Sequence, residues 1–156
     1  MSTTTAFASP TYAAFNRLVR VQTALWRAVD VRLRDRHHVA LADVTALHLV
    51  AGTDASRVQD LAATLHITVG GASKVVDRLV AAGLVARAPH PTDRRSSVLT
   101  VTPAGHDLLD RTSADVEDVL RDTLEEALDV AGIARLDELL RLLEGSIDTR
   151  PEGTVA

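Results

Sequence analysis

The apolar residues between positions 68 and 102 change their spacing once, at Gly83. Before Gly83 they recur every three or four positions, which places them on one face of a helix. These residues are Ala72, Val75, Val76, Leu79 and Val80. Glycine readily adopts the left-handed conformation that closes a helix, so the helix is expected to end there. Two β-prone runs, 84–88 and 97–102, then flank the polar, basic segment PHPTDRR, which predicts a β-hairpin.

A second helix is predicted directly before this one. Residues 57–65 carry apolar side chains at helical spacing, and Ser56 is a suitable N-cap for them. Only the pair His66-Ile67 separates this helix from Thr68, whose hydroxyl is expected to cap the next helix. Two helices joined this tightly are typical of a helix-turn-helix.

Long amphipathic helices are predicted at both ends of the chain. The remaining expected helices span residues 11–36, 43–51, 104–129 and 134–147. The pair Ala131-Gly132 is expected to break the pattern between the last two. We expect residues 11–150 to form a single domain, with a disordered tail over 1–10 and a frayed tail over 151–156.

The apolar stripes of the terminal helices exceed what one small domain can easily cover. Large exposed apolar patches on soluble proteins usually mark partner surfaces, and the simplest partner is a second copy of the chain. We therefore expect residues 11–36 and 104–148 to be homodimerisation helices around a lobe over 42–102; the alternative is an intrachain core. The expected interface residues are Tyr12, Phe15, Leu18, Leu136, Leu139, Leu140 and Leu143.

Charge is distributed unevenly along the chain. The formal net charge is −4, which by itself argues weakly against a nucleic-acid partner. Divided by region, however, residues 1–56 carry +2, residues 57–97 carry +3 and residues 98–156 carry −9. The predicted helix-turn-helix and hairpin are thus locally positive, as a surface that faces phosphates must be.

Composition narrows the class of protein further. At 156 residues the chain is long enough for one domain with a sizeable core. It has no cysteine, which excludes disulfides and thiol catalysis and fits a reducing compartment. No segment approaches the roughly 20 apolar residues of a membrane span, and the N-terminus does not resemble a signal peptide. We expect a cytoplasmic protein without a membrane partner.

The polar face of the predicted second helix is suited to double-stranded DNA. A helix in the major groove reads base edges with side chains near its N-terminus, and Thr68, Ser73 and Lys74 are placed for this role. Gly70-Gly71 either allows close approach to the base pairs or is merely tolerated, at a cost of about 1 kcal/mol of helix stability per glycine. Arg78 either touches the DNA backbone or pairs with Asp77 or another acid.

The basic tip of the hairpin has a matching role. Arg94 and Arg95 have the length and charge to enter a narrow minor groove, whose potential is strongly negative over A·T-rich DNA. The alternative is a solvated charged turn. A dimer would present two copies of each element and so bind a pseudo-palindromic duplex with half-sites about 34–36 Å apart.

Taken together, these residues resemble the MarR family of bacterial winged-helix regulators from about residue 10 to 148. The resemblance is carried by Leu61-Ala62 to Leu65, by Thr68 to Leu79, by Gly83-Leu84-Val85, by Asp93-Arg94-Arg95, and by the run Leu99 to Gly105. It implies a mainly α fold with a small β-hairpin wing, in which N- and C-terminal dimerisation helices flank a winged helix-turn-helix core. One departure is His66, which lies where helix-turn-helix sequences often carry glycine.

The resemblance also implies a function: a homodimeric, sequence-specific transcriptional regulator, most simply a ligand-responsive repressor. It implies that Asp93 orients a wing arginine. The expected DNA contacts are Ser56, Arg57, Thr68, Gly70, Gly71, Ser73, Lys74, Arg78, Asp93, Arg94 and Arg95. Effector sites of this family lie where the dimer helices meet the DNA-binding lobe, which suggests a small organic effector of unknown identity. The residues expected near it are Trp26, His37, Leu47, His48 and Leu108.

Other classes of function find less support in the sequence. His106 and Asp110 form an i, i+4 pair on a helix, but two ligands do not make a metal site, so no metal or cofactor is assigned. We find no phosphate-binding glycine loop, nucleophile elbow or paired carboxylates, and we expect no enzyme. The alternative is a winged-helix protein-interaction module that does not bind DNA, which the acidic helices would suit.

Overall fold

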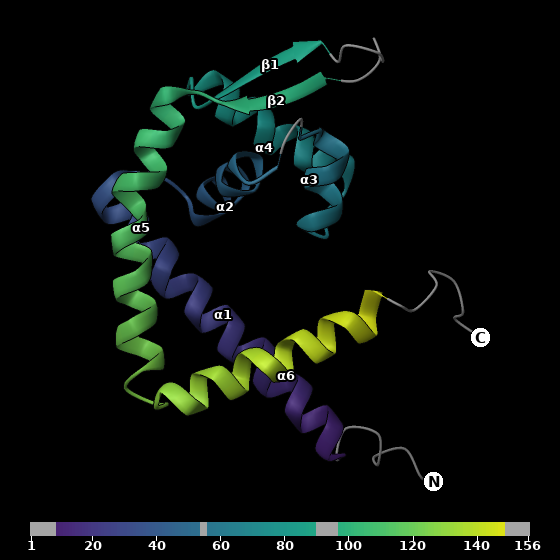
Figure 1. Ribbon diagram of the computed structural model, residues 1–156, viewed down its shortest axis with the longest axis vertical. Coiled ribbons are helices and arrows are strands. Elements are labelled where there is room, and N and C mark those ends of the chain that lie inside the picture. The colour runs from purple at the N-terminus through teal and green to yellow at the C-terminus, as the bar shows by residue number, and fades with distance from the viewer. Residues whose placement is uncertain (1–8, 54–55, 90–96, 149–156) are drawn as a thin grey trace, which may run out of the picture. The chain divides into compact units, whose positions relative to one another are not determined.

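The computed structural model describes residues 9–53, 56–89 and 97–148. The chain divides into two compact units, Met1–Glu117 and Asp118–Ala156, and each is described here by itself. The prediction of a single domain over 11–150 therefore stays a prediction. Within the described residues the structure has six helices and one two-stranded antiparallel hairpin (Figure 1), which confirms the predicted mainly α fold with a hairpin wing. None of its helices is both long enough and apolar enough to cross a membrane.

The order of the elements follows the sequence pattern closely. The elements are α1 (Pro10–His37), α2 (Leu41–Ala51), α3 (Val58–Thr64), α4 (Val69–Ala81), β1 (Val85–Pro89), β2 (Ser97–Val101), α5 (Pro103–Leu124) and α6 (Val130–Asp148). Helix α1 begins at Pro10 because the Ser9 hydroxyl accepts a hydrogen bond from the Tyr12 N–H at 3.1 Å. The expected tail is therefore already ordered at Ser9; residues 1–8 and 149–156 lie outside the described residues.

Helices α3 and α4 form the predicted helix-turn-helix. Helix α3 ends in a left-handed residue, His66 (φ 50°), and the Ile67 N–H reaches back to the Ala62 carbonyl at 3.0 Å. This closing pattern usually has glycine at the left-handed position. His66 therefore occupies the position of the usual glycine and adopts the same backbone conformation. Thr68 then caps α4 as predicted, since its hydroxyl accepts the Gly71 N–H at 3.1 Å.

The N-cap predicted for α3 is wrong by one residue. Arg57 holds the cap position, and its N–H donates to the Asp60 carboxylate at 2.8 Å. Ser56 is instead buried, and its carbonyl accepts a hydrogen bond from the Leu99 N–H of β2 at 2.8 Å. The residue before α3 is thus hydrogen-bonded to the hairpin. This long-range contact cannot be inferred from the local spacing of residues.

Helix α4 and the hairpin are joined as predicted. Gly83 (φ 71°) closes the helix, and the Leu84 N–H bonds the Leu79 carbonyl at 2.9 Å. Strand β1 pairs with β2 in a register that sets Val85 opposite Val101. Val80, expected on the buried face of α4, is 38% exposed because it lies at the edge of that face.

A single apolar core holds the first unit together. Helices α2, α3, α4 and α5 and both strands each contribute buried side chains to it. Its members are Ala46, Leu47, Val50, Leu61, Val76, Leu79, Val85, Leu99 and Leu108. Gly105 marks its tightest point, because a Cβ there would lie 2.3 Å from the Leu84 carbonyl oxygen. Helix α5 can therefore approach the hairpin only with glycine at this position.

The C-terminal helices differ from prediction at two boundaries, the end of the helix expected over 104–129 and the start of the helix expected over 134–147. Helix α5 ends at Leu124, and α6 begins at Val130, before the expected break at Ala131-Gly132. The Asp129 carboxylate accepts the Gly132 N–H at 2.8 Å and so caps the helix that was expected to begin after this glycine. A glycine in a first turn is tolerated where a good cap precedes it.

Candidate nucleic-acid interface and ligand pocket

Helix α4 presents its polar face to solvent at its N-terminal end. Lys74 is exposed and Ser73 is half-buried, while Ala72, Val76 and Leu79 turn into the core. The first N–H groups of a helix have no partner within it and favour anions. The capping hydroxyl of Thr68 still has its own proton to donate. This end of α4 therefore offers hydrogen-bond donors and one positive charge to solvent.

The two glycines of α4 differ in their surroundings. Nothing lies within 4 Å of a Cβ built on Gly70, so this position is open to solvent or a partner. A Cβ on Gly71 would lie 3.3 Å from the capping Thr68 hydroxyl oxygen. The absence of a side chain at Gly71 thus makes room for the capping hydroxyl. At Gly70 no neighbour requires glycine, which fits the expected close approach to a partner.

Arg78 has a protein partner on another helix. Its Nη2 lies 2.6 Å from Oδ1 of Asp43 in the first turn of α2. The sequence left open whether Arg78 meets DNA or an acid, and the structure supplies an acid that sequence reasoning did not name. Asp43 could have been noticed as an acidic residue at a helix start, but its pairing over 35 positions could not.

Asp77 and Arg87 form a second link, from α4 to the hairpin. Arg87 of β1 donates to Asp77 Oδ1 at 3.1 Å, and both side chains are well exposed. Sequence reasoning missed Arg87, although a basic residue in a strand that leads to a basic tip was a usable signal. It adds a cation to the edge of the surface formed by α4.

Several predicted DNA contacts are not placed on this surface. The wing residues Asp93, Arg94 and Arg95 lie outside the described residues. Ser56 is only 3% exposed, so its side chain cannot reach DNA, and we remove it from the predicted contacts. Arg57 is half-buried at the start of α3.

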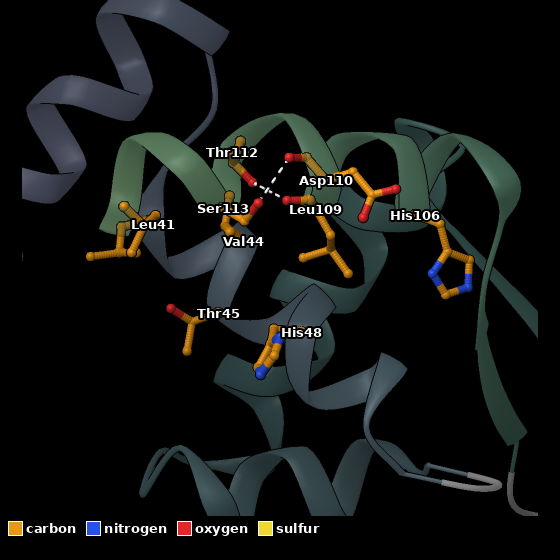
Figure 2. Close-up of a pocket in the computed structure, with 10 residues that line it drawn as sticks. Leu41, Val44, Thr45, His48, His106, Leu109, Asp110, Thr112 and Ser113 are labelled. Carbon is orange, nitrogen blue, oxygen red and sulfur yellow. Dashed lines mark hydrogen bonds between the residues drawn. The ribbon is translucent and has the colours of Figure 1, made fainter. Parts of the chain in front are cut away.

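A pocket of about 530 Å³ lies between α2 and α5 (Figure 2). Its lining is mostly apolar with a few polar groups, which is typical of sites for small organic molecules. The lining residues are Leu41, Val44, Thr45, His48, His106, Leu109, Asp110, Thr112, Ser113 and Val116. Ser113 and Thr112 donate to carbonyls of their own helix. Within the described residues the side chains of His48, His106 and Asp110 make no hydrogen bond or ion pair, which leaves them for a ligand.

Only His48 of the five predicted effector residues lines this pocket. Leu47 and Leu108 are buried in the core, one helical step away from His48 and Leu109, which do face the pocket. A helix turns about 100° per residue, so neighbours in sequence face different surroundings. Trp26 is 41% exposed on α1, away from these lining residues. Four of the five predicted side chains thus do not line the pocket between α2 and α5, and the effector site itself stays a prediction.

His37, the remaining predicted effector residue, binds a buried carboxylate instead. Its Nε2 lies 2.6 Å from Oδ2 of Asp115 on α5, and Arg36 and Arg32 also pair with that carboxylate. The pKa of Asp115 is lowered, first by the His37 hydrogen bond and then by the charges of Arg36, His37 and Arg32, against the opposing effect of burial. This cluster fastens the end of α1 to α5.

Asp30 fastens α1 to α2 in a similar way. Its carboxylate accepts the Leu41 N–H at 2.8 Å and pairs with Arg34 at 2.6 Å. The hydrogen bonds from Arg34 and Leu41 lower the pKa of Asp30. Since Ala40 provides no side-chain cap, Asp30 caps the N-terminus of α2 from a distance.

The described residues contain no group of three or more histidine and acidic side chains arranged to hold a metal ion. His106 and Asp110, the i, i+4 pair noted in the sequence, both line the pocket. Their place there gives them a second interpretation, as polar contacts to an organic ligand.

A helix-turn-helix followed by a hairpin, with a capped second helix whose polar face is exposed, defines a winged helix-turn-helix protein. Residues 39–96 match the model of the MarR family, which confirms the predicted resemblance for this segment. No curated protein is similar enough in sequence to be matched.

Solved structures of MarR-type regulators share this fold over most of the chain. A MarR family transcriptional regulator from Streptomyces coelicolor, solved in complex with DNA, has a TM-score of 0.78 at 23% identity and covers 92% of this chain and 91% of its own. BpsR from Bordetella bronchiseptica, whose DNA binding is regulated by 6-hydroxynicotinic acid, has a TM-score of 0.74 at 23% identity, covering 83% and 91%. CouR from Rhodococcus jostii, bound to p-coumaroyl-CoA, has a TM-score of 0.70 at 24% identity, covering 88% and 92%.

Proposed function

We propose that this chain is a cytoplasmic, homodimeric transcriptional regulator of the MarR type, which binds a specific double-stranded DNA operator and is released by a small organic ligand. One observation carries the proposal: the capped N-terminal end of α4, with Thr68, Ser73 and Lys74 on a face that the core does not use. Such an end is suited to the major groove. Repression is the simplest outcome of operator binding.

The DNA contacts proposed are Thr68, Gly70, Ser73 and Lys74 on α4, with Gly71 supporting the cap. The wing residues Asp93, Arg94 and Arg95, which lie outside the described residues, and Arg57 are also proposed DNA contacts. The basic balance of residues 57–97 supports the choice of nucleic acid over a protein partner.

Fluorescence anisotropy with the DNA upstream of the chain's own gene tests this proposal. We expect binding that exceeds binding to unrelated DNA by at least about 1,000-fold and weakens steeply with salt. Lys74→Met should lower the slope of log affinity against log salt by about 1.8, as expected when each of the two protomers loses one phosphate contact. The double variant Arg94→Ala/Arg95→Ala should weaken binding as well.

Lys74→Met has a matched control in Arg135→Met, which removes one positive charge from α6. This control should leave the salt slope unchanged. If the wild-type chain binds no duplex in preference to random DNA, the proposal fails, and the alternative of a protein-interaction module gains.

The ligand is proposed to occupy the pocket between α2 and α5. Its size and its mixed apolar and polar lining suit a small aromatic acid such as 6-hydroxynicotinic acid, the effector of a structural relative. We expect this probe to raise the melting temperature of the wild type and to reduce DNA binding. His48→Leu should abolish both effects, whereas His38→Leu, outside the pocket, should abolish neither. No effect on the wild type would reject this class of ligand.

A further inference from the structure

The ion pair between Arg78 and Asp43 spans two helices with different tasks. Arg78 lies on α4, which carries the proposed DNA contacts, and Asp43 lies in the first turn of α2. The guanidinium Nη2 and the carboxylate Oδ1 are 2.6 Å apart. The Asp43 side chain is 19% exposed and the Arg78 side chain 54% exposed. The carboxylate is thus the more fixed partner, and the arginine reaches to it.

The α2 side of this pair is firmly anchored. Ala46 and Leu47, in the next turn of the helix, are completely buried in the core. The Asp30 carboxylate holds the Leu41 N–H at the start of the same helix. The pKa of Arg34 is raised first by its hydrogen bond to Asp30 and by the charge of Asp30, and last by the charge of Asp43. A side chain that pairs with Asp43 is therefore tied to a rigid part of the molecule.

The position of α4 in the core is set by its own buried residues. Ala72, Val76 and Leu79 fix how deeply the helix lies there. Its N-terminal turn contains Gly70 and Gly71, which weaken the helix where it would meet DNA. Rotation of α4 about its own axis would change which side chains face a duplex. A polar contact on the flank of the helix opposes that rotation.

We propose that Arg78 is a positioning residue, which fixes the rotation of the recognition helix through its ion pair with Asp43 and does not itself contact DNA. The inference rests on the proposed DNA-binding function. It reassigns a residue for which the charge pattern alone suggested a phosphate contact. For Lys74, one turn earlier on the same helix, we propose the phosphate contact instead.

Two single variants separate positioning from phosphate contact. Arg78→Met should weaken operator binding about 2- to 5-fold at every salt concentration, in proportion to the modest strength of an exposed ion pair. The slope of log affinity against log salt should stay unchanged, because no phosphate contact is lost. Asp43→Asn should also weaken binding, even though it removes one negative charge from the chain.

The charge-swapped double variant Asp43→Arg/Arg78→Asp provides the rescue. It restores an ion pair between α2 and α4 while it places an acid on the helix that faces DNA. We expect it to recover at least half of the affinity lost in Arg78→Met, with the wild-type salt slope. Lys74→Met, measured in parallel, should lower that slope by about 1.8, because each of the two protomers loses one phosphate contact. Melting temperatures of all variants establish that each is folded.

Several results would overturn the inference. They are a lower salt slope in Arg78→Met, tighter binding in Asp43→Asn, no recovery in the folded double variant, or wild-type affinity in both single variants. Each would show that Arg78 meets a phosphate directly or plays no part in binding. Absence of operator binding by the wild-type chain would be a different outcome. It would reject the proposed function and this inference with it.

Discussion

His38 and His66 hold the left-handed backbone conformation that most residues avoid, with φ values of 56° and 50°. His38 follows α1 and His66 follows α3, so each closes a helix in the way that Gly83 closes α4. The left-handed conformation costs an ordinary residue roughly 1–2 kcal/mol, although histidine adopts it more readily than most. His66 therefore carries strain in the turn of the helix-turn-helix, and nothing in the core requires its exposed side chain.

Substitutions at His66 should follow its backbone conformation. We expect His66→Gly to keep the free energy of unfolding within about 1 kcal/mol of wild type, because relief of strain offsets the greater freedom of glycine in the unfolded chain. His66→Val should lower it by roughly 1–2 kcal/mol, since a β-branched residue fits this conformation poorly. Urea unfolding measures both. Equal stability of the two variants would contradict the assignment of φ at this position.

At the scale of elements, carboxylates make the links between helices. Asp30 links α1 to α2, Asp115 links α1 to α5, and Asp43 links α2 to α4. Each accepts from a residue at least 11 positions away, so each link depends on the tertiary fold. The pocket lies between two of the helices that these links position, which ties its shape to the same contacts.

The Asp115 cluster should make stability depend on acid. The pKa of Asp115 is lowered from its ordinary value of 3.8 in the folded chain. Its contribution is therefore fully present above that ordinary value and is lost as the pH falls through the folded pKa. The lowered pKa of Asp30 acts in the same direction. We expect the free energy of unfolding to fall below about pH 4, because the unfolded chain binds protons that the folded chain does not.

Asp115→Asn should reduce the slope of the free energy of unfolding against pH in the acid range, by an amount that corresponds to at most about one proton. It should also lower stability at pH 7, because His37, Arg36 and Arg32 lose a shared charged partner. Urea unfolding between pH 3 and pH 7 provides the measurement. Asp35→Asn, at an exposed position of α1, the helix that carries the three cations of the cluster, is the control. If the free energy of unfolding of Asp115→Asn falls as steeply with acid as that of the wild type, Asp115 is not the source of the acid dependence.

At the scale of the whole molecule, both terminal helices leave large apolar side chains in solvent. Phe15 of α1 is 58% exposed and Leu142 of α6 is 65% exposed, and most of the predicted interface residues are exposed in the single chain. The other exposed apolar residues of these helices include Leu18, Trp26, Leu136, Leu139, Leu140 and Leu143. A second copy of the chain is the partner that we propose for these surfaces.

Substitutions in the leucine stripe of α6 should separate the proposed dimer. We expect the double variant Leu139→Glu/Leu143→Glu to raise the dissociation constant by at least about 100-fold. Each substitution removes the burial of one leucine side chain in the interface, which contributes about 1.5–3 kcal/mol. Ala134→Glu, on the opposite side of α6, should leave it unchanged. Sedimentation velocity at micromolar concentration measures both. A wild-type chain that sediments as a monomer would reject the dimer.

The sequence by itself determined every element and nearly all helix ends, because these depend on local spacing, on caps such as Thr68 and on Gly83. It also placed the polar face of α4, since the opposite face had to be apolar. It misplaced the N-cap of α3, because Ser56 is bound to a distant strand, and it misplaced the end of α5 and the start of α6, where Asp129 provides the cap. The tertiary structure alone decided which charged groups meet: His37 with Asp115 and Arg78 with Asp43, 78 and 35 positions apart. It also decided that the pocket is lined by His48 and Leu109 and not by Leu47 and Leu108, because the rotation of each helix is fixed by the core against which it packs.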